Sequence, residues 1–465
     1  MPWYTEISAI KREVTDVIHI PYGAARIIDR LEAEGFEAYV VGGCVRDSLL
    51  CLSPHDWDIC TSAPPEKILQ VFSGFRVIET GLKHGSVTVL MDQAPYEVTT
   101  FRVDGPYTDQ RRPDSVSFVE SLKEDVSRRD FTINAMAYHP QKGLFDFFGG
   151  AEDLQRKLIR CVGDPNRRFS EDALRLLRGL RFAATYEFSI EPATAKSLYD
   201  HRESLKAVAQ ERIRVEFVRL LTGPGAVDIL NTFFSVICVF LPELQPMKEF
   251  DQKSPHHNLD LWAHTLKALF ASPPQEIIRL SVLMHDLGKP DCFTQDENGI
   301  GHFYGHPEKS AQMAEAILKR LRFDNRTVQA VETLVRFHGD DIAPARHSVR
   351  KWLARMGEEA LRQLLVIKRA DAAAQSPAEL PTKMAQLNQV EEVLAQVLSE
   401  SPCLSLKDLK VNGSDLIALG IPPGPAIGRI LSGLLARVMD EKLENQPEAL
   451  LEEARRMQKD QSCDW

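Results

Sequence analysis

The pattern of apolar and polar positions divides the chain into a mixed first part and a helical remainder. Residues 21–35 are expected to form a helix, with proline in the first turn and glycine at the end. Short runs of β-branched residues at 37–43, 86–91 and 96–102 predict strands. After a glycine turn at 147–154 the pattern is helical. The sequence therefore predicts an α/β part followed by an all-α part.

Two proline-bearing stretches, at 241–258 and 375–383, predict further domain breaks in the helical part. A length of 465 residues indicates roughly three domains. The contents of 44% hydrophobic and 26% charged residues are those of an ordinary globular protein with several cores. Neither an internal repeat nor a low-complexity tract is visible in the sequence.

Three features of the sequence predict a cytoplasmic protein. The first sixteen residues are polar and lack the apolar region of a signal peptide. The most apolar segment, 227–241, is too short to span a membrane and predicts a core helix. The eight cysteines are scattered without a CxxC pair, which favours free thiols in a reducing compartment over a zinc ribbon or a disulfide framework.

The charge of the chain is uneven. A net charge of −10 argues against a nonspecific nucleic-acid binder. Residues 154–220, however, hold fourteen Lys or Arg against nine Asp or Glu. This local excess permits specific contact with a polyanion, although a solvated helical face would have the same composition. Charge alone leaves both interpretations open.

The first candidate site follows the predicted strand at 37–43. Gly42 and Gly43 allow backbone amides to approach a ligand closely, and the helix expected next offers free N–H groups and Arg46 to a phosphate. Asp56 and Asp58 are two residues apart, which on a strand would place both carboxylates on one face. Such a pair repels unless a cation such as Mg²⁺ lies between them. A turn is the ordinary explanation of either motif alone, but the combination is more specific.

Five motifs follow one another along the first half of the chain: GGCVRD (42–47), DWD (56–58), SRRDFTINAMA (127–137), RRFSEDALRLLRGLRFAA (167–184) and QERIRVEF (210–217). In this order they resemble the motifs of class II tRNA nucleotidyltransferases, the family of CCA-adding enzymes and related bacterial poly(A) polymerases. The stretch at 411–431 also resembles the tail of bacterial CCA-adding enzymes.

The resemblance implies an α/β head with a polymerase-β-like nucleotidyltransferase sheet, followed by all-α neck, HD body and tail domains that hold tRNA. The expected boundaries are 1–150 for the head, 151–248 for the neck, 249–375 for the HD domain and 376–465 for the tRNA-binding tail.

The same resemblance assigns roles at the first site. Asp56 and Asp58, joined by Glu97 from a neighbouring strand, would be catalytic and bind two Mg²⁺ ions, which activate the tRNA 3′-hydroxyl and steady the pyrophosphate. Gly43 and Arg46 would hold the triphosphate. Further along, Arg129 would contact the nucleotide and Asp130 would accept a hydrogen bond from the ribose. Arg128 is a weaker candidate, and a helix cap is the plain alternative for Asp130.

The helical pattern at 170–184 is expected to place Asp172, Arg175 and Arg178 on one face, after a turn at 163–169 and a cap at Ser170. The opposite face is expected to be buried and consists of Ala173, Leu177, Leu180 and Ala184. An amphipathic helix with ion pairs would have the same pattern. The resemblance implies instead that Asp172 and Arg175 pair with the base edge of CTP or ATP, since a carboxylate accepts from the exocyclic amine that C and A share. Arg178 and Arg181 are further candidate nucleotide-binding residues.

A second candidate site lies between residues 250 and 375. An apolar helix ends in adjacent His285 and Asp286, which would be costly to bury without a partner such as a metal ion. With His264 and Asp371 they resemble the ordered ligands of the HD phosphohydrolase superfamily, which implies a divalent metal and a phosphatase or 2′,3′-cyclic phosphodiesterase activity. An inactive HD scaffold is the main alternative. Two further histidines, His306 and His338, would add a second metal or bind phosphate.

The resemblance favours an enzyme that adds CCA to tRNA from CTP and ATP without a nucleic-acid template. A poly(A) polymerase, or an enzyme that adds only CC or only A, is the alternative. The HD residues and the absence of a strongly basic tail favour CCA addition. A non-catalytic RNA-binding module is disfavoured because the acidic pair and the arginines are intact. An HD hydrolase of free nucleotides leaves the five motifs unexplained.

Overall fold

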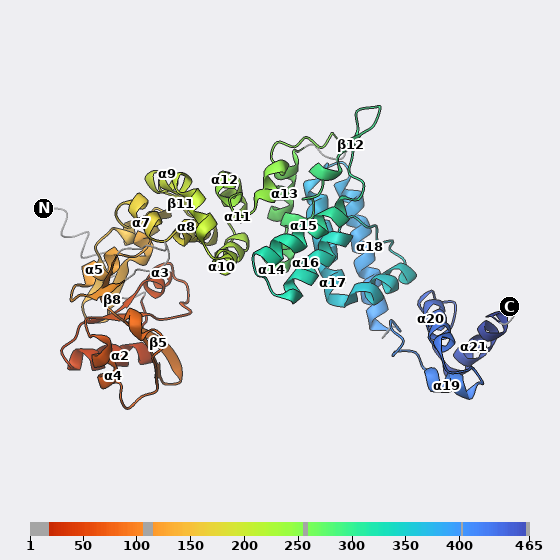
Figure 1. The fold of residues 1–465 in the computed structure, drawn as a ribbon, viewed down its shortest axis with the longest axis horizontal. Helices are drawn as coiled ribbons and strands as arrows, with labels where there is room; N and C mark the ends of the chain where they lie inside the picture. Colours follow the sequence, from red (N-terminus) through yellow and green to blue (C-terminus); the bar gives the residue numbers. More distant parts are fainter. Residues whose placement is uncertain (1–17, 106–114, 254–258, 401–402, 462–465) are drawn as a thin grey trace. The chain divides into compact units, whose positions relative to one another are not determined.

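The computed structural model describes residues 18–105, 115–253, 259–400 and 403–461. The chain forms two compact units, 1–242 and 243–465 (Figure 1). The finer division into four domains stays a prediction.

The first unit combines a mixed sheet with short helices. Its helices are α2 (Tyr22–Ala33), α3 (Gly43–Leu49), α4 (Pro65–Val71), η1 (Leu82–His84), α5 (Leu122–Ser127), η2 (Thr132–Asn134), α6 (Gly150–Gln155), α7 (Pro165–Glu171), α8 (Leu174–Tyr186), α9 (Pro192–Asp200), η3 (Arg202–Ala207), α10 (Gln210–Leu221), α11 (Ala226–Thr232) and α12 (Phe234–Ile237). Its strands are β1 (Ala38–Val41), β2 (Ile59–Thr61), β3 (Val77–Ile78), β4 (Ser86–Met91), β5 (Ala94–Thr100), β6 (Arg102–Asp104), β7 (Val116–Phe118), β8 (Met136–His139), β9 (Gly143–Asp146), β10 (Leu158–Ile159) and β11 (Ser189–Ile190).

Seven of these strands form one sheet in the order β3-β4-β5-β2-β1-β8-β9. Within it β2 runs parallel to β5, and the other neighbours are antiparallel. The prediction of a mixed α/β first part is confirmed, and the predicted strands correspond to β1, β4 and β5.

Packing in the hydrophobic core of the first unit accounts for the position of these strands. All four residues of β1 are buried, and β4 alternates buried and half-buried positions, as expected for strands covered by helices. Tyr39 of β1 packs in one apolar cluster with Phe101, Val126 and Ala137. Helix α2 buries Ile27, among others, against the sheet. The core therefore fixes the carboxyl end of β1, where the first candidate site begins.

Helix α8 packs against α10 and α11 in the first unit. The face that the sequence predicts to be buried is buried, with Ala173, Leu177, Leu180 and Ala184 all at 0% exposure. The opposite face carries arginines toward the head. Burial of the apolar face therefore turns the arginine face of α8 toward the candidate site.

The second unit is almost entirely helical, in the green-to-blue part of Figure 1. Gly357 has a φ of +80° and divides its longest helix, α17, at a kink. The elements are η4 (Pro242–Met247, which begins at the boundary), α13 (Leu261–Ala271), α14 (Glu276–Met284), η5 (Pro290–Cys292), β12 (Thr294–Gln295), β13 (Gly301–His302), α15 (His306–Arg320), α16 (Asn325–Phe337), α17 (Arg346–Ala374), α18 (Leu380–Ser399), α19 (Gly413–Ala418), α20 (Pro425–Met439) and α21 (Pro447–Gln461).

Candidate functional site

The turn between β1 and α3 requires glycine at its first position. Gly42 has a φ of +83°, and a Cβ there would lie 2.7 Å from a guanidinium nitrogen of Arg129. A side chain would therefore be strained and would displace that arginine. Gly43 begins α3 with a negative φ. The backbone of this turn therefore packs closely against the Arg129 side chain.

The acidic pair lies just before a strand and not on it, so that part of the sequence prediction is wrong. Strand β2 begins at Ile59, and the Asp58 carbonyl accepts the Val41 amide at 3.0 Å. Since Ile59 is opposite Val98 in the parallel pair of β2 and β5, Asp58, one residue before β2, lies beside Glu97 in the middle of β5.

Several charged side chains lie close together beside the start of β2. Asp58 keeps contact with solvent, but the surrounding protein removes part of its hydration, and Glu97 and Asp56 add negative charge. Together these effects raise the pKa of Asp58, while Arg129 opposes them. Carboxylates that repel in this way offer the oxygen ligands that Mg²⁺ prefers. The residues present therefore fit a magnesium site.

Arg46 is buried between the head and α8. It donates to Asp47 at 2.8 Å and to the side-chain oxygen of Asn134. Its guanidinium lies over the rings of Phe182 and Tyr186, at 5.1 and 5.0 Å from their centroids. Arg46 of the GGCVRD motif therefore contacts Asn134 and Phe182, which belong to two other motifs.

Asp130 is buried beside the same site. Its carboxylate accepts the Phe131 amide at 2.8 Å, the Asn134 amide group at 3.0 Å and the Arg178 Nε at 2.7 Å. Burial disfavours the charged form, but Arg178 and these hydrogen bonds hold the pKa of Asp130 well below its usual range. Asp130 therefore stays ionised and fixes Arg178 in place.

Asp172 lies between two helices, which corrects the prediction of one continuous helical face. Residues 165–171 form α7, capped by Asp164, where the sequence predicts a turn. Ser170 is inside α7, so its predicted cap role is wrong. Asp172 has extended backbone, with φ −140° and ψ 106°, and its carboxylate accepts the Leu174 amide at 3.0 Å. It forms an ion pair with Arg212 at 2.9 Å.

Arg175 and Arg181 are both anchored by glutamates. The Arg175 guanidinium donates to Glu171 at 2.6 Å, and to the carbonyls of residues 168 and 128, both at 3.0 Å. Arg181 pairs with Glu216 at 2.8 Å. These contacts hold the arginines at fixed positions along α8.

A cavity of about 400 Å³ joins these groups. All eight residues that the sequence indicates for nucleotide binding line it, whereas Asp56 and Glu97 are not among its lining residues. Sequence reasoning missed Asn134 and Phe182, although both lie inside the quoted motifs, Phe182 one helical turn after Arg178. The lining residues are Gly43, Arg46, Asp58, Arg128, Arg129, Asp130, Asn134, Asp172, Arg175, Arg178, Arg181 and Phe182.

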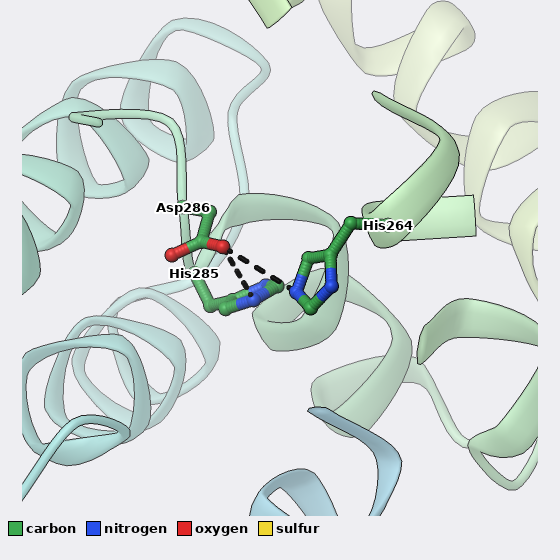
Figure 2. A group of neighbouring side chains, drawn as sticks. All are labelled: His264, His285 and Asp286. Atoms are coloured by element: carbon green, nitrogen blue, oxygen red, sulfur yellow. Dashed lines mark ion pairs between the residues drawn. The ribbon is translucent and has the colours of Figure 1, made fainter. Parts of the chain in front are cut away.

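The second candidate site gathers residues from α13, from α17 and from the turn that follows α14. Figure 2 shows His264 of α13 facing His285 and Asp286, which directly follow α14. The His285 Nε2 lies 3.0 Å from the Asp286 Oδ2, and the His264 Nε2 lies 3.6 Å from it. Asp371 of α17 completes the group, with its Oδ1 3.0 Å from the His264 Nε2. The structure thus brings the four predicted residues together.

Burial and the neighbouring charges act in opposite directions on the carboxylate of this group. Burial disfavours the charged form of Asp286, yet His285 and Lys289 hold the pKa of that carboxyl well below its usual range. The Lys289 Nζ lies 2.8 Å from the Asp286 Oδ2, a contact that sequence reasoning missed. Imidazole and carboxylate groups that converge in this way fit a divalent transition metal.

Three family models match parts of the chain. A Poly A polymerase head domain matches residues 38–160, an RNA- and SrmB-binding region of polymerase A matches 187–245, and a tRNA nucleotidyltransferase domain 2 matches 293–454. Among the described residues, none of the helices has the length and apolar character needed to cross a membrane.

The chain is similar along its length to curated and solved proteins. It is 36% identical to a CCA-adding enzyme of Limosilactobacillus fermentum, covering 93% of this chain and 96% of that one. A CCA-adding enzyme of Enterococcus faecalis is also 36% identical, over 93% and 95%. The Bacillus stearothermophilus CCA-adding enzyme in complex with CTP matches with a TM-score of 0.70 at 28% identity, over 95% and 98%. A Thermotoga maritima enzyme complexed with tRNA shares the fold, with a TM-score of 0.60 at 19% identity, over 96% and 98%.

Proposed function

Because this chain belongs to the family of CCA-adding enzymes, we propose that it adds C, C and A to the 3′ end of tRNA. CTP and ATP would be the substrates, and no nucleic-acid template would be needed. The observation that carries the proposal is the cavity in which all eight indicated nucleotide-binding residues meet. We expect this reaction in the cytoplasm. A poly(A) polymerase, or an enzyme that adds only CC or only A, is the alternative.

The group of carboxylates beside the start of β2 supports a two-metal reaction. Asp56 and Asp58, with Glu97 beside them, would hold the Mg²⁺ ions, which lower the pKa of the attacking hydroxyl and neutralise charge on the phosphates when bound. Positively charged side chains of the protein would act beside these ions. Arg46 and the backbone of Gly43 line the cavity and are suited to the triphosphate.

Base selection would depend on Asp172 and Arg175. C and A present an exocyclic amine where G and U present a carbonyl, so a carboxylate at that position distinguishes the two pairs. The Asp172 Oδ1 accepts the Leu174 amide at 3.0 Å and an Arg212 N–H at 3.4 Å, whereas Oδ2 accepts one Arg212 N–H at 2.9 Å and keeps a second lone pair for the base. Glu171 and two carbonyls orient Arg175 at the cavity wall. The pair is therefore suited to read one edge of the base.

A second candidate activity is hydrolysis of phosphate esters at the four-residue site of the second unit. The observation that favours it is the convergence of His264, His285, Asp286 and Asp371, which fits a divalent metal. The metal would polarise the phosphate and supply a hydroxide. Phosphomonoesters and 2′,3′-cyclic phosphates are the proposed substrates. An inactive scaffold is the alternative.

The test of the first activity uses purified protein and tRNAs that lack CCA, CA or A. Each is offered each of the four nucleoside triphosphates with Mg²⁺. We expect C on the first two RNAs and A on the third, and no further extension. A long A tail would favour a poly(A) polymerase. Absence of A on the third RNA, or absence of C on the first two, would favour partial addition.

The test of the second activity measures hydrolysis of a phosphomonoester and of a 2′,3′-cyclic nucleotide with Mg²⁺, Mn²⁺, Ni²⁺ and Co²⁺. Hydrolysis that disappears in His285→Ala supports the proposal. Absence of hydrolysis with all four metals would favour the scaffold.

A further inference from the structure

The Asn134 side chain lies between two charged residues of the first site. Asn134 ends the short helix η2, lines the cavity and is buried, with 5% exposure. The Arg46 guanidinium donates a hydrogen bond to its Oδ1, and its Nδ2 donates to the Asp130 Oδ1 at 3.0 Å. One amide therefore connects a buried cation to a buried anion.

The two neighbours determine the orientation of this amide. A guanidinium only donates hydrogen bonds, and an ionised carboxylate only accepts them. The oxygen of Asn134 must therefore face Arg46, and its nitrogen must face Asp130. An amide meets both requirements without a charge of its own. A leucine of similar volume would leave both neighbours without this partner, and an ionised aspartate would repel Asp130.

The Arg46 guanidinium is held at two of its edges. Its Nε donates to the Asp47 carboxylate at 2.8 Å, and its Nη1 donates to Asn134. Because the guanidinium is planar and its donors have a rigid arrangement, these two bonds fix the direction of the whole group. Its Nη2 lies 3.6 Å from the position that a Cβ on Gly43 would take, so this end faces the turn suited to a triphosphate. Without Asn134 the group would keep the bond to Asp47 and turn about it.

The other end of the amide connects Arg46 to helix α8. The Asp130 Oδ1 accepts the Asn134 Nδ2, and the Asp130 Oδ2 accepts the Arg178 Nε at 2.7 Å. The backbone amide of Asn134 donates to the carbonyl of Phe131 at 2.9 Å, so the turn of η2 holds the residue in place. Arg46, Asn134, Asp130 and Arg178 therefore form one continuous chain of hydrogen bonds along the cavity.

We propose that Asn134 is a positioning residue for nucleotidyl transfer, which orients Arg46 toward the triphosphate. This inference rests on the proposed function. Both ends of the Asn134 amide bond to protein groups, so its effect on the nucleotide is exerted through Arg46. Loss of a buried hydrogen bond to a charged group should weaken triphosphate binding by about 5- to 150-fold. The loss should be equal for CTP and ATP, because the two nucleotides share the same triphosphate.

The test measures the affinity of the full-length chain for inorganic tripolyphosphate with Mg²⁺ by isothermal titration calorimetry. This probe has the charges of the triphosphate without a base or a sugar, and its binding requires no turnover. Asn134→Ala should bind it about 5- to 150-fold more weakly than the wild type, and KM for CTP and for ATP should rise by one common factor. Asn166→Ala is the matched control, because Asn166 is exposed and donates to Asp164 at 3.3 Å, and it should bind the probe like the wild type.

Asn134→Asp gives a readout that a merely structural role would not change. When protonated, the new carboxyl group donates to Asp130 and accepts from Arg46, as the amide does. When ionised, it neutralises Arg46 and repels Asp130. Burial and Asp130 raise the pKa of the new group, and Arg46 opposes them. The affinity for tripolyphosphate, relative to the wild type at the same pH, should therefore fall at least about tenfold between about pH 5.5 and 9. Asn166→Asp should follow the wild type.

The ratio to the wild type removes the titration of the probe and of the other charged groups around this position. These groups are Asp58, Arg129 and Arg178 along the cavity, and Asp153 of α6, which accepts from Thr132 of η2.

Wild-type affinity in Asn134→Ala would overturn the proposal, as would an Asn134→Asp ratio that does not change with pH or a wild-type chain that does not bind tripolyphosphate. Asn134→Asp, which has as many non-hydrogen atoms as asparagine, decides the question if Asn134→Ala does not fold. Failure of the proposed function is a separate result. A chain whose tripolyphosphate binding depends on Asn134 but which adds no nucleotide keeps the positioning of Arg46 and loses CCA addition.

Discussion

Replacing Asp172 by alanine should change which nucleotide is chosen and not only how fast it is added. The substitution removes the acceptor for the amine that C and A share, so discrimination against UTP and GTP should fall. Loss of one buried hydrogen bond corresponds to about 1–3 kcal/mol, or roughly 5- to 150-fold in the ratio of kcat/KM.

The same substitution also removes two structural contacts. The ion pair with Arg212, at 2.9 Å between partly exposed side chains, contributes up to about 1 kcal/mol. The hydrogen bond to the Leu174 amide, at 3.0 Å, acts as a helix cap and contributes about 1 kcal/mol. Together they predict about 2 kcal/mol of destabilisation, which in a unit of this size lowers Tm by about 4–8 °C.

Arg212→Ala separates the two effects, because it removes the ion pair and keeps the carboxylate. It should lower stability by up to about 1 kcal/mol and leave nucleotide choice unchanged. The assay measures kcat/KM for all four nucleoside triphosphates on tRNA lacking CCA, with thermal unfolding in parallel. Constant ratios in Asp172→Ala, or an equal change of the ratios in Arg212→Ala, would show that the carboxylate does not read the base.

Three further outcomes are expected. Asp58→Ala should abolish CTP incorporation while tRNA binding in a filter assay stays near wild type; retained incorporation with Mg²⁺ would contradict the metal-site assignment. Gly42→Ala should lower stability by about 1–3 kcal/mol, because its φ is +83° and its Cβ meets Arg129 at 2.7 Å, whereas Gly43→Ala should change stability in a thermal melt by less than about 0.5 kcal/mol. Equal effects would refute the strain argument. His285→Ala should remove metal-dependent hydrolysis and spare CTP incorporation, and parallel loss of both activities would show that the sites are not separable.

The sequence predicts well the elements that local pattern determines. The strand before Gly42 and the buried face of α8 follow from apolar runs and periodicity, which burial in the core then enforces. The grouping of the cavity residues came from the motif resemblance, since no local rule connects residues 46 and 178.

The errors have physical causes. The spacing of Asp56 and Asp58 is the same on a strand and in the extended segment before it, so sequence cannot place the strand start. Residues 170–184 form one amphipathic pattern with no Pro and with no Gly before Gly179, whereas the break at Asp172 coincides with a contact to Arg212, forty residues later. The helix at 165–171 had a local signal, Asp164 followed by proline, which is typical of a helix start.

The position of Arg46 between Phe182 and Tyr186 has a mechanical consequence. Tyr186 also donates to Asp47 at 2.9 Å, so the turn after β1 and helix α8 are connected by stacking and by a hydrogen bond. The groups suited to phosphates and those suited to the base therefore keep a constant separation, which fits one nucleotide. A site of fixed size does not lengthen with its product. Each added nucleotide must therefore leave the site before the next one binds, so successive additions require the RNA end to move back and bind again.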